Sequence, residues 1–132
     1  MALNRKFITP APVKREPIQY LTDNGFSIIR RCDVDGSFPK DGIEHCFIVR
    51  DPDGYELDIT VRFDTRAAAE VVERSNRRIS FESSFWVNAA ERHLSEYLWE
   101  YNDYPPDASL TIDQLSLDDM DSARRWNGDG AL

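Results

Sequence analysis

Apolar and polar residues alternate in the two stretches that flank Asp51-Pro52-Asp53-Gly54. Proline at the second position of a turn presets φ, and glycine supplies the positive φ of the bulge that follows, so this segment predicts a tight hairpin turn. Pairing Asp51 with Tyr55 fixes the register, and one face of the hairpin is then almost wholly apolar. That face carries Ile43, His45, Phe47, Val49, Leu57, Ile59, Val61 and Phe63. Glu56, Asp58, Thr60 and Arg62 fall on the opposite face, so the pattern predicts a half-buried sheet.

An earlier strand over residues 26–31 completes a predicted three-stranded antiparallel meander. Helical periodicity follows, with one helix predicted over residues 65–78 and a second over 84–102. Thr111 with Gln114 has the spacing of a capping box, and Ser116 before two aspartates predicts the start of a last short helix. The sequence therefore predicts an α+β fold: a three-stranded antiparallel meander packed on one face by two helices, with a C-terminal helical segment.

The first 17 residues differ in character from the rest. They contain Pro10, Pro12 and Pro17 together with four basic side chains and a single acidic one. Prolines disfavour helix and favour extended backbone, so residues 1–17 predict an extended basic arm. Residues 18–127 are expected to form a single α+β domain, and 128–132 a flexible tail.

Charge is distributed unevenly along the chain. Residues 1–80 hold 13 acidic and 13 basic side chains, whereas residues 81–132 hold 11 acidic and 3 basic ones, so the whole net charge of −8 lies in the C-terminal part. An acidic segment repels phosphate backbones, and we therefore expect no nucleic acid as a direct partner. It favours a basic partner, and a solvated acidic surface that maintains solubility is the simpler alternative.

The composition also restricts the class of protein and the cellular compartment that we expect. Hydrophobic residues make up 41% of the chain, and no apolar run approaches the length of about 20 residues that spans a bilayer. Two cysteines are too few for a disulfide scaffold. We expect a soluble cytoplasmic protein with no membrane partner.

Metal binding is not predicted. Residues 33–44 place oxygen-bearing side chains as an EF-hand loop does, but Phe38 occupies the position that needs glycine. Cys32, His45, Cys46 and His93 lack the spacing of a zinc site. We expect no metal and no cofactor, and neither thiol has a neighbour in sequence that would activate it as a nucleophile.

The second predicted helix carries most of the candidate functional residues. Aromatic and charged side chains off its main apolar stripe, or near its C-terminal end, are typical of protein interfaces. These interface candidates are Phe85, Arg92, Glu96, Trp99, Tyr101 and Tyr104. If this helix packs on the sheet, a polar pocket beneath it would be lined by His45, Trp86, His93 and Tyr97.

These observations predict a small non-catalytic protein-interaction module, accessory or regulatory, with an acidic C-terminal surface. Its partner would be another protein or a second copy in a homodimer. One alternative is a small-molecule-binding protein or enzyme with a pocket at His45 and His93. Another is an acidic inhibitor that mimics nucleic acid.

Overall fold

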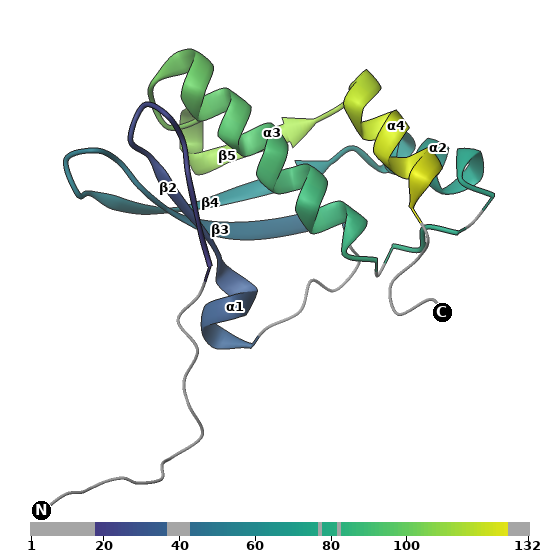
Figure 1. Cartoon of the computed structure of the whole chain (residues 1–132), viewed down its shortest axis with the longest axis horizontal. Coiled ribbons are helices and arrows are strands. Elements are labelled where there is room, and N and C mark those ends of the chain that lie inside the picture. The colour runs from purple at the N-terminus through teal and green to yellow at the C-terminus, as the bar shows by residue number, and fades with distance from the viewer. Residues whose placement is uncertain (1–17, 37–42, 77, 82, 127–132) are drawn as a thin grey trace, which may run out of the picture.

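The computed structural model describes residues 18–36, 43–76, 78–81 and 83–126. It is an α+β structure, in which one five-stranded sheet has the strand order β1-β2-β3-β4-β5 (Figure 1). The strands are β1 (Gln19–Leu21), β2 (Ser27–Arg30), β3 (Glu44–Arg50), β4 (Glu56–Phe63) and β5 (Ser109–Ile112). The helices are α1 (Arg31–Asp35), α2 (Thr65–Arg74), α3 (Phe85–Tyr101) and α4 (Leu117–Arg125), and a short 3₁₀ turn, η2 (Pro106–Ala108), precedes β5.

The predicted register of the central hairpin is confirmed. Val49 pairs with Leu57, Phe47 with Ile59 and His45 with Val61 in β3 and β4. The turn is closed by the N–H of Asp51, which donates to the carbonyl of Tyr55 at 2.9 Å, and Gly54 takes a φ of 94°. The Asp51 carboxylate accepts two further backbone N–H groups, so aspartate and glycine each have a geometric role in the turn.

The sheet has two strands more than the meander predicted from sequence. β1 extends the antiparallel part by pairing with β2, and β5 adds to β4 in parallel. Thr111 lies within β5 and caps no helix, so the capping box expected at Thr111 and Gln114 was wrong. The capping box is formed instead by Ser116 and Asp119 at the start of α4, where the last helix was expected.

The two long helices match their predicted positions with one difference. The Asp64 carboxylate caps α2, which ends at Arg74 rather than at residue 78. Asn76 adopts a left-handed φ of 55°, and the hydroxyl of Ser75 donates to the carbonyl of Val72, so the chain leaves the helix here. α3 spans Phe85–Tyr101 and ends at Asn102, whose left-handed φ of 54° terminates the helix.

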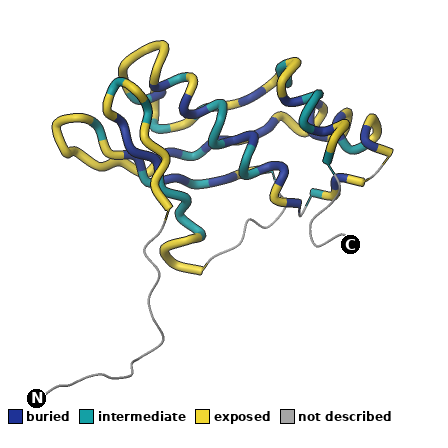
Figure 2. Tube along the Cα trace, in the orientation of Figure 1, coloured by how far each residue is buried: buried dark blue, intermediate teal, exposed yellow. Residues whose placement is uncertain are grey.

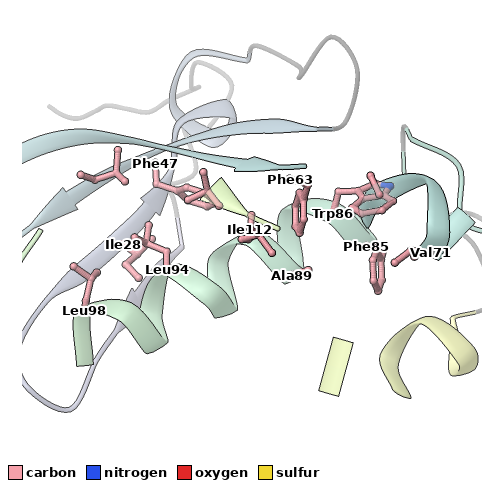
Figure 3. Packing of buried hydrophobic residues seen from close by; sticks show 14 of the residues in the cluster. Ile28, Phe47, Phe63, Val71, Phe85, Trp86, Ala89, Leu94, Leu98 and Ile112 are labelled. Atoms are coloured by element: carbon pink, nitrogen blue, oxygen red, sulfur yellow. The ribbon is translucent and has the colours of Figure 1, made fainter. Parts of the chain in front are cut away.

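A single apolar core lies between the sheet and α3, as Figure 3 shows. Leu94 and Leu98 of α3 lie beside Ile28 and Phe47 of the sheet in that view. At the opposite end of the helix an aromatic cluster fills the space toward α2 and α4. Its contacts are edge-to-face packing of Trp86 on Phe63 and Phe85, stacking of Trp86 on Phe81, and edge-to-face packing of Phe85 on Trp126.

The pattern of burial follows this core, and the buried segments in Figure 2 are the sheet and the inner sides of the helices. Glu56, Asp58 and Arg62 are exposed on the other face, as predicted. Leu57 shares the core face but is 40% exposed, because it lies next to the β3–β4 turn. Tyr101, an interface candidate near the end of α3, is also exposed.

Three predictions fall on residues outside the described ranges. They concern the basic arm at residues 1–17, the tail at 128–132, and half of the loop considered for calcium at 33–44, namely residues 37–42.

Candidate functional site

The most polar contact of the interior joins α3 to α4. Asp119 is fully buried at the third position of α4. One oxygen of its carboxylate accepts a hydrogen bond from the Arg92 guanidinium, and the other is hydrogen-bonded to the His93 ring. The His93 Nε2 lies 2.5 Å from the Asp119 Oδ2, and the backbone N–H of Ser116 donates to the same oxygen at 2.9 Å. A buried carboxylate needs such partners, because an unpaired charge in this place would be strongly destabilising.

The environment of Asp119 lowers its pKa well below the usual range. Burial alone would raise the pKa by disfavouring the charged form, but hydrogen bonds from His93, the Ser116 backbone and Arg92 outweigh it. Asp119 is therefore charged at neutral pH and anchors α4 to α3. Because Arg92 has its guanidinium on this carboxylate, the residue has a structural function, although the sequence analysis placed it among the interface candidates.

The pocket predicted beneath α3 does not unite the expected residues. His93 lines a groove at the edge of the sheet, and His45 is not among the residues of that groove. His45 is buried on β3, edge-to-face with Phe63. Trp86 is fully buried, and its indole N–H donates to the Ser80 carbonyl at 2.8 Å. Of the four pocket candidates, His93 and Tyr97 line this same groove.

That groove runs between α3 and β5 and has a volume of about 240 Å³. We call it the acidic groove. Its walls are His93, Glu96, Tyr97, Glu100 and Tyr101 from the helix and residues 110–114 from β5 and the turn after it. Of the described residues that line it, none is Lys or Arg. Asp113 adds a third carboxylate to those of Glu96 and Glu100, so the groove has the electrostatic character of a site for a cation.

The backbone of β5 borders the acidic groove with unpaired groups. The N–H of Asp64 donates to the carbonyl of Ile112 at 2.8 Å, so Ile112 bonds toward β4. Backbone groups of alternate residues point to the same side of a strand, so Leu110 also bonds toward β4, whereas Ser109 and Thr111 face outward. β5 is the last strand of the sheet, and within the described ranges no strand pairs with its outer edge.

A second groove lies at the opposite edge of the sheet, between β1 and α3, and we call it the β1 groove. It has a volume of about 200 Å³ and is lined by Tyr20, Leu21, Thr22, Asp23, Ser95, Glu96 and Trp99. Trp99, one of the interface candidates, is 58% exposed there. Another groove, of about 290 Å³, lies between α2 and the turn before α4. Its charges are mixed, with Arg74 paired to Glu70.

The interface candidates thus divide into two groups. Glu96, Trp99 and Tyr101 are exposed on the C-terminal half of α3. Phe85 is only 1% exposed, so its assignment as a contact residue was wrong; the C-terminal segment with Trp126 covers it. Tyr104 is partly buried against Phe26, and its hydroxyl donates to the carbonyl of Tyr55 at 2.7 Å, which ties the end of α3 to the central hairpin.

The thiols and possible metal ligands offer little chemistry. Burial raises the pKa of both Cys32 and Cys46, which disfavours the reactive thiolate. Among residues 18–36, 43–76, 78–81 and 83–126, no three His, Cys, Asp or Glu side chains converge as metal ligands. In the same ranges no helix combines the length and apolar character needed to cross a bilayer.

Sequence reasoning found His93, Glu96, Tyr97 and Tyr101 of the acidic groove but missed Glu100, Thr111 and Asp113. β5 is four residues long and pairs with a strand far away in sequence, so it leaves no local pattern. No known family model, no curated protein and no solved structure matches this chain.

Proposed function

We propose that the protein is a non-catalytic interaction module, accessory or regulatory, that binds a basic extended segment of a partner protein in the acidic groove. The observation that carries the proposal is that three carboxylates and two tyrosine rings line one groove. This groove lies next to a strand edge that pairs with no other described strand. Glu96, Glu100 and Asp113 form no ion pair with another described residue. Such carboxylates are available to an incoming Lys or Arg without loss of an existing contact.

The aromatic residues of the groove suit the same ligand. Tyr97 and Tyr101 lie one helical turn apart, with ring centroids 4.4 Å from each other. A tyrosine ring attracts a cation placed over its face, by about 0.5–1 kcal/mol at an exposed site. Neighbouring carboxylates and ring faces together favour a Lys or Arg side chain over an acidic or purely apolar one.

The edge of β5 accounts for the extended conformation of the ligand. A peptide that adds as a further strand obtains backbone hydrogen bonds from Ser109 and Thr111, while its alternate side chains point toward the groove. Affinity then comes from the main chain, and preference for a basic partner comes from the carboxylates.

A panel of ten-residue peptides tests this function. The peptides share a Thr/Val-rich sequence and carry zero, two or four Lys residues, and binding to the full chain is measured by calorimetry. We expect affinity to rise with the number of Lys residues and to fall with added salt, since the groove is exposed. Equal binding of the neutral and basic peptides would contradict the proposal.

Variants identify the groove as the binding surface. E100Q with D113N changes two carboxylates that line the acidic groove and not the β1 groove. This double variant should weaken the four-Lys peptide about five-fold or more, from two exposed ion pairs of roughly 0.5–1 kcal/mol each. D33N with D53N removes two exposed carboxylates elsewhere and is the matched control, with affinity unchanged. If both double variants lose affinity equally, the effect is one of net charge and the groove is not the site.

A further inference from the structure

The outer edge of β1 pairs with no other described strand. The N–H of Thr22 donates to the carbonyl of Phe26 at 2.9 Å, so the backbone groups of Thr22 point toward the neighbouring strand. Inward and outward groups alternate along an antiparallel strand, so Tyr20 also bonds inward. The N–H and C=O groups of Gln19 and Leu21 therefore face outward, where they can pair with a further strand.

Four large apolar side chains surround this edge. Ile18 is 81% exposed, Leu21 66% and Tyr20 47%. Trp99 of α3 lines the β1 groove together with Tyr20 and Leu21, and it is 58% exposed. Natural proteins cover or block an apolar edge strand, because it is a template for pairing with another chain. The occupant of this edge should supply both backbone partners and apolar contacts.

We propose that β1 of a second copy of this chain occupies the edge, so that two sheets join into one across a two-fold axis. An antiparallel pair of β1 strands centred on Tyr20 places Gln19 of each copy opposite Leu21 of the other. The outward N–H and C=O groups of these two residues are then all paired, in four hydrogen bonds. The contact is closed, because each copy presents the same surface to the other.

The same register brings aromatic side chains together. Tyr20 is the cross-strand neighbour of Ile28, whose side chain is buried beneath α3 (Figure 3), so Tyr20 lies on the α3 side of the sheet. On the two-fold axis, Tyr20 meets Tyr20 of the second copy at a position without hydrogen bonds, where side chains approach most closely. Trp99 lines the β1 groove beside each tyrosine, so two tyrosines and two tryptophans form the apolar centre of the interface.

The exposed apolar surface is large enough for a weak dimer. Trp99 and Tyr20 each expose about half of a side chain that can bury roughly 150–250 Å². Together with Ile18 and Leu21, the exposed apolar surface is on the order of 300 Å² per copy. A two-fold contact buries roughly 600 Å² through these side chains alone, and the paired strand edges bring the total toward about 1,000 Å². This area is typical of a reversible complex.

Net charge distinguishes this interface from the acidic groove. Each copy has a formal charge of −8, so two copies repel each other, and added salt should strengthen the dimer by screening that repulsion. Added salt should instead weaken the binding of a Lys-rich peptide. The inference rests on β1 and Trp99, which do not line the acidic groove, and it does not depend on the proposed function. The two proposals can therefore fail separately.

Sedimentation equilibrium of the full chain tests the dimer. We expect a reversible monomer–dimer equilibrium with a Kd of about 1–100 μM, as for other small interfaces, and tighter association at higher salt. A chain that stays monomeric at concentrations up to about 1 mM would overturn the inference.

Two substitutions separate the backbone and side-chain contributions, each with a matched control. Gln19→Pro removes an outward N–H from each copy without removing a donor to β2, and should weaken the dimer about ten-fold or more. Gln19→Ala keeps that N–H and should change the Kd little. Trp99→Ala should weaken the dimer about ten-fold, whereas Tyr55→Ala, which removes a 72% exposed ring at the β3–β4 turn, should not.

Hydrogen exchange locates the interface within β1. The amides of Gln19 and Leu21 should exchange about five-fold more slowly well above the Kd than well below it. The amide of Tyr20 faces β2 and should be protected equally at both concentrations. The amides of Val49 and Ile59 report in every variant that the sheet is folded.

Two further results would overturn the inference. A dimer that neither Gln19→Pro nor Trp99→Ala weakens would use another surface. Protection of the Gln19 and Leu21 amides at concentrations where the chain is monomeric would show that the edge is covered within one copy.

Discussion

The His93 Nε2 and the Asp119 Oδ2 lie 2.5 Å apart, and this contact fixes the position of α4 on α3. Asp119 also closes the capping box of its own helix, so one carboxylate both starts α4 and attaches it to the core. The acidic groove depends on this arrangement, because His93 lines it and residues 113 and 114 lead into α4.

Removing the buried carboxylate should destabilise the protein. Asp119→Ala leaves Arg92 and His93 without their shared partner and breaks the cap, and we expect a loss of about 3 kcal/mol in the free energy of unfolding. Urea denaturation followed by circular dichroism measures the change. Asp121→Ala, which removes an exposed partner of Arg124, should cost less than about 1 kcal/mol. Equal losses in the two variants would show that Asp119 is no anchor.

The free energy of unfolding at low pH should depend on the protonation of Asp119. A carboxylate whose folded-state pKa is lowered stabilises the protein above its unfolded pKa of about 3.9, and the contribution is lost as pH falls through the folded-state pKa. The difference in unfolding free energy between the wild type and Asp119→Asn should therefore be constant near pH 5. It should shrink as pH falls from about 4 toward 2, measured by denaturation at each pH. A difference that stays constant to pH 2 would argue against a lowered pKa.

Two large residues on the core face of the central hairpin should differ in how much stability is lost when each is replaced by alanine. Phe47 is fully buried between the sheet and α3, and Phe47→Ala should cost about 3–5 kcal/mol. Leu57 is on the same face but 40% exposed, so Leu57→Ala should cost less than about 1.5 kcal/mol. Thermal or chemical unfolding of both variants provides the comparison. A costly Leu57 variant would mean that the end of the hairpin is covered in solution.

The cysteines are expected to be slow nucleophiles. Burial raises the pKa of Cys32 and Cys46, so alkylation by iodoacetamide at pH 8 should be several-fold slower in the folded than in the unfolded chain. Peptide mass spectrometry resolves the two sites. Faster alkylation of either thiol in the folded protein would contradict this prediction and would support a reactive cysteine.

The central part of the fold could be predicted because its signals are local. The β3–β4 register follows from strict alternation and one turn, and the ends of α3 follow from serines before it and prolines after it. β1 and β5 were missed because each has four residues or fewer and is defined by its partner strand. Neither has a run long enough for a period to show.

The residues of the candidate site could likewise be predicted where the signal is local and not where it depends on a distant partner. Glu96 and Trp99 could be recognised because helical spacing places them away from the apolar stripe. Asp119 was read as a helix-starting residue, since nothing in its neighbourhood indicates that His93, 26 residues earlier, packs against it. Phe85 was misassigned for the related reason that its cover comes from Trp126, at the far end of the described chain.

The central claim is that the acidic groove binds a basic extended segment, and amide chemical-shift mapping of the full chain tests it most directly. On titration with the four-Lys peptide, we expect the largest shifts at Thr111, Asp113 and residues 96–101, and small shifts at Ile48 and Thr60 on the opposite face of the sheet. Both sets should be small with the neutral peptide. Shifts that cluster on the opposite face, or that are equal for the two peptides, would contradict the account.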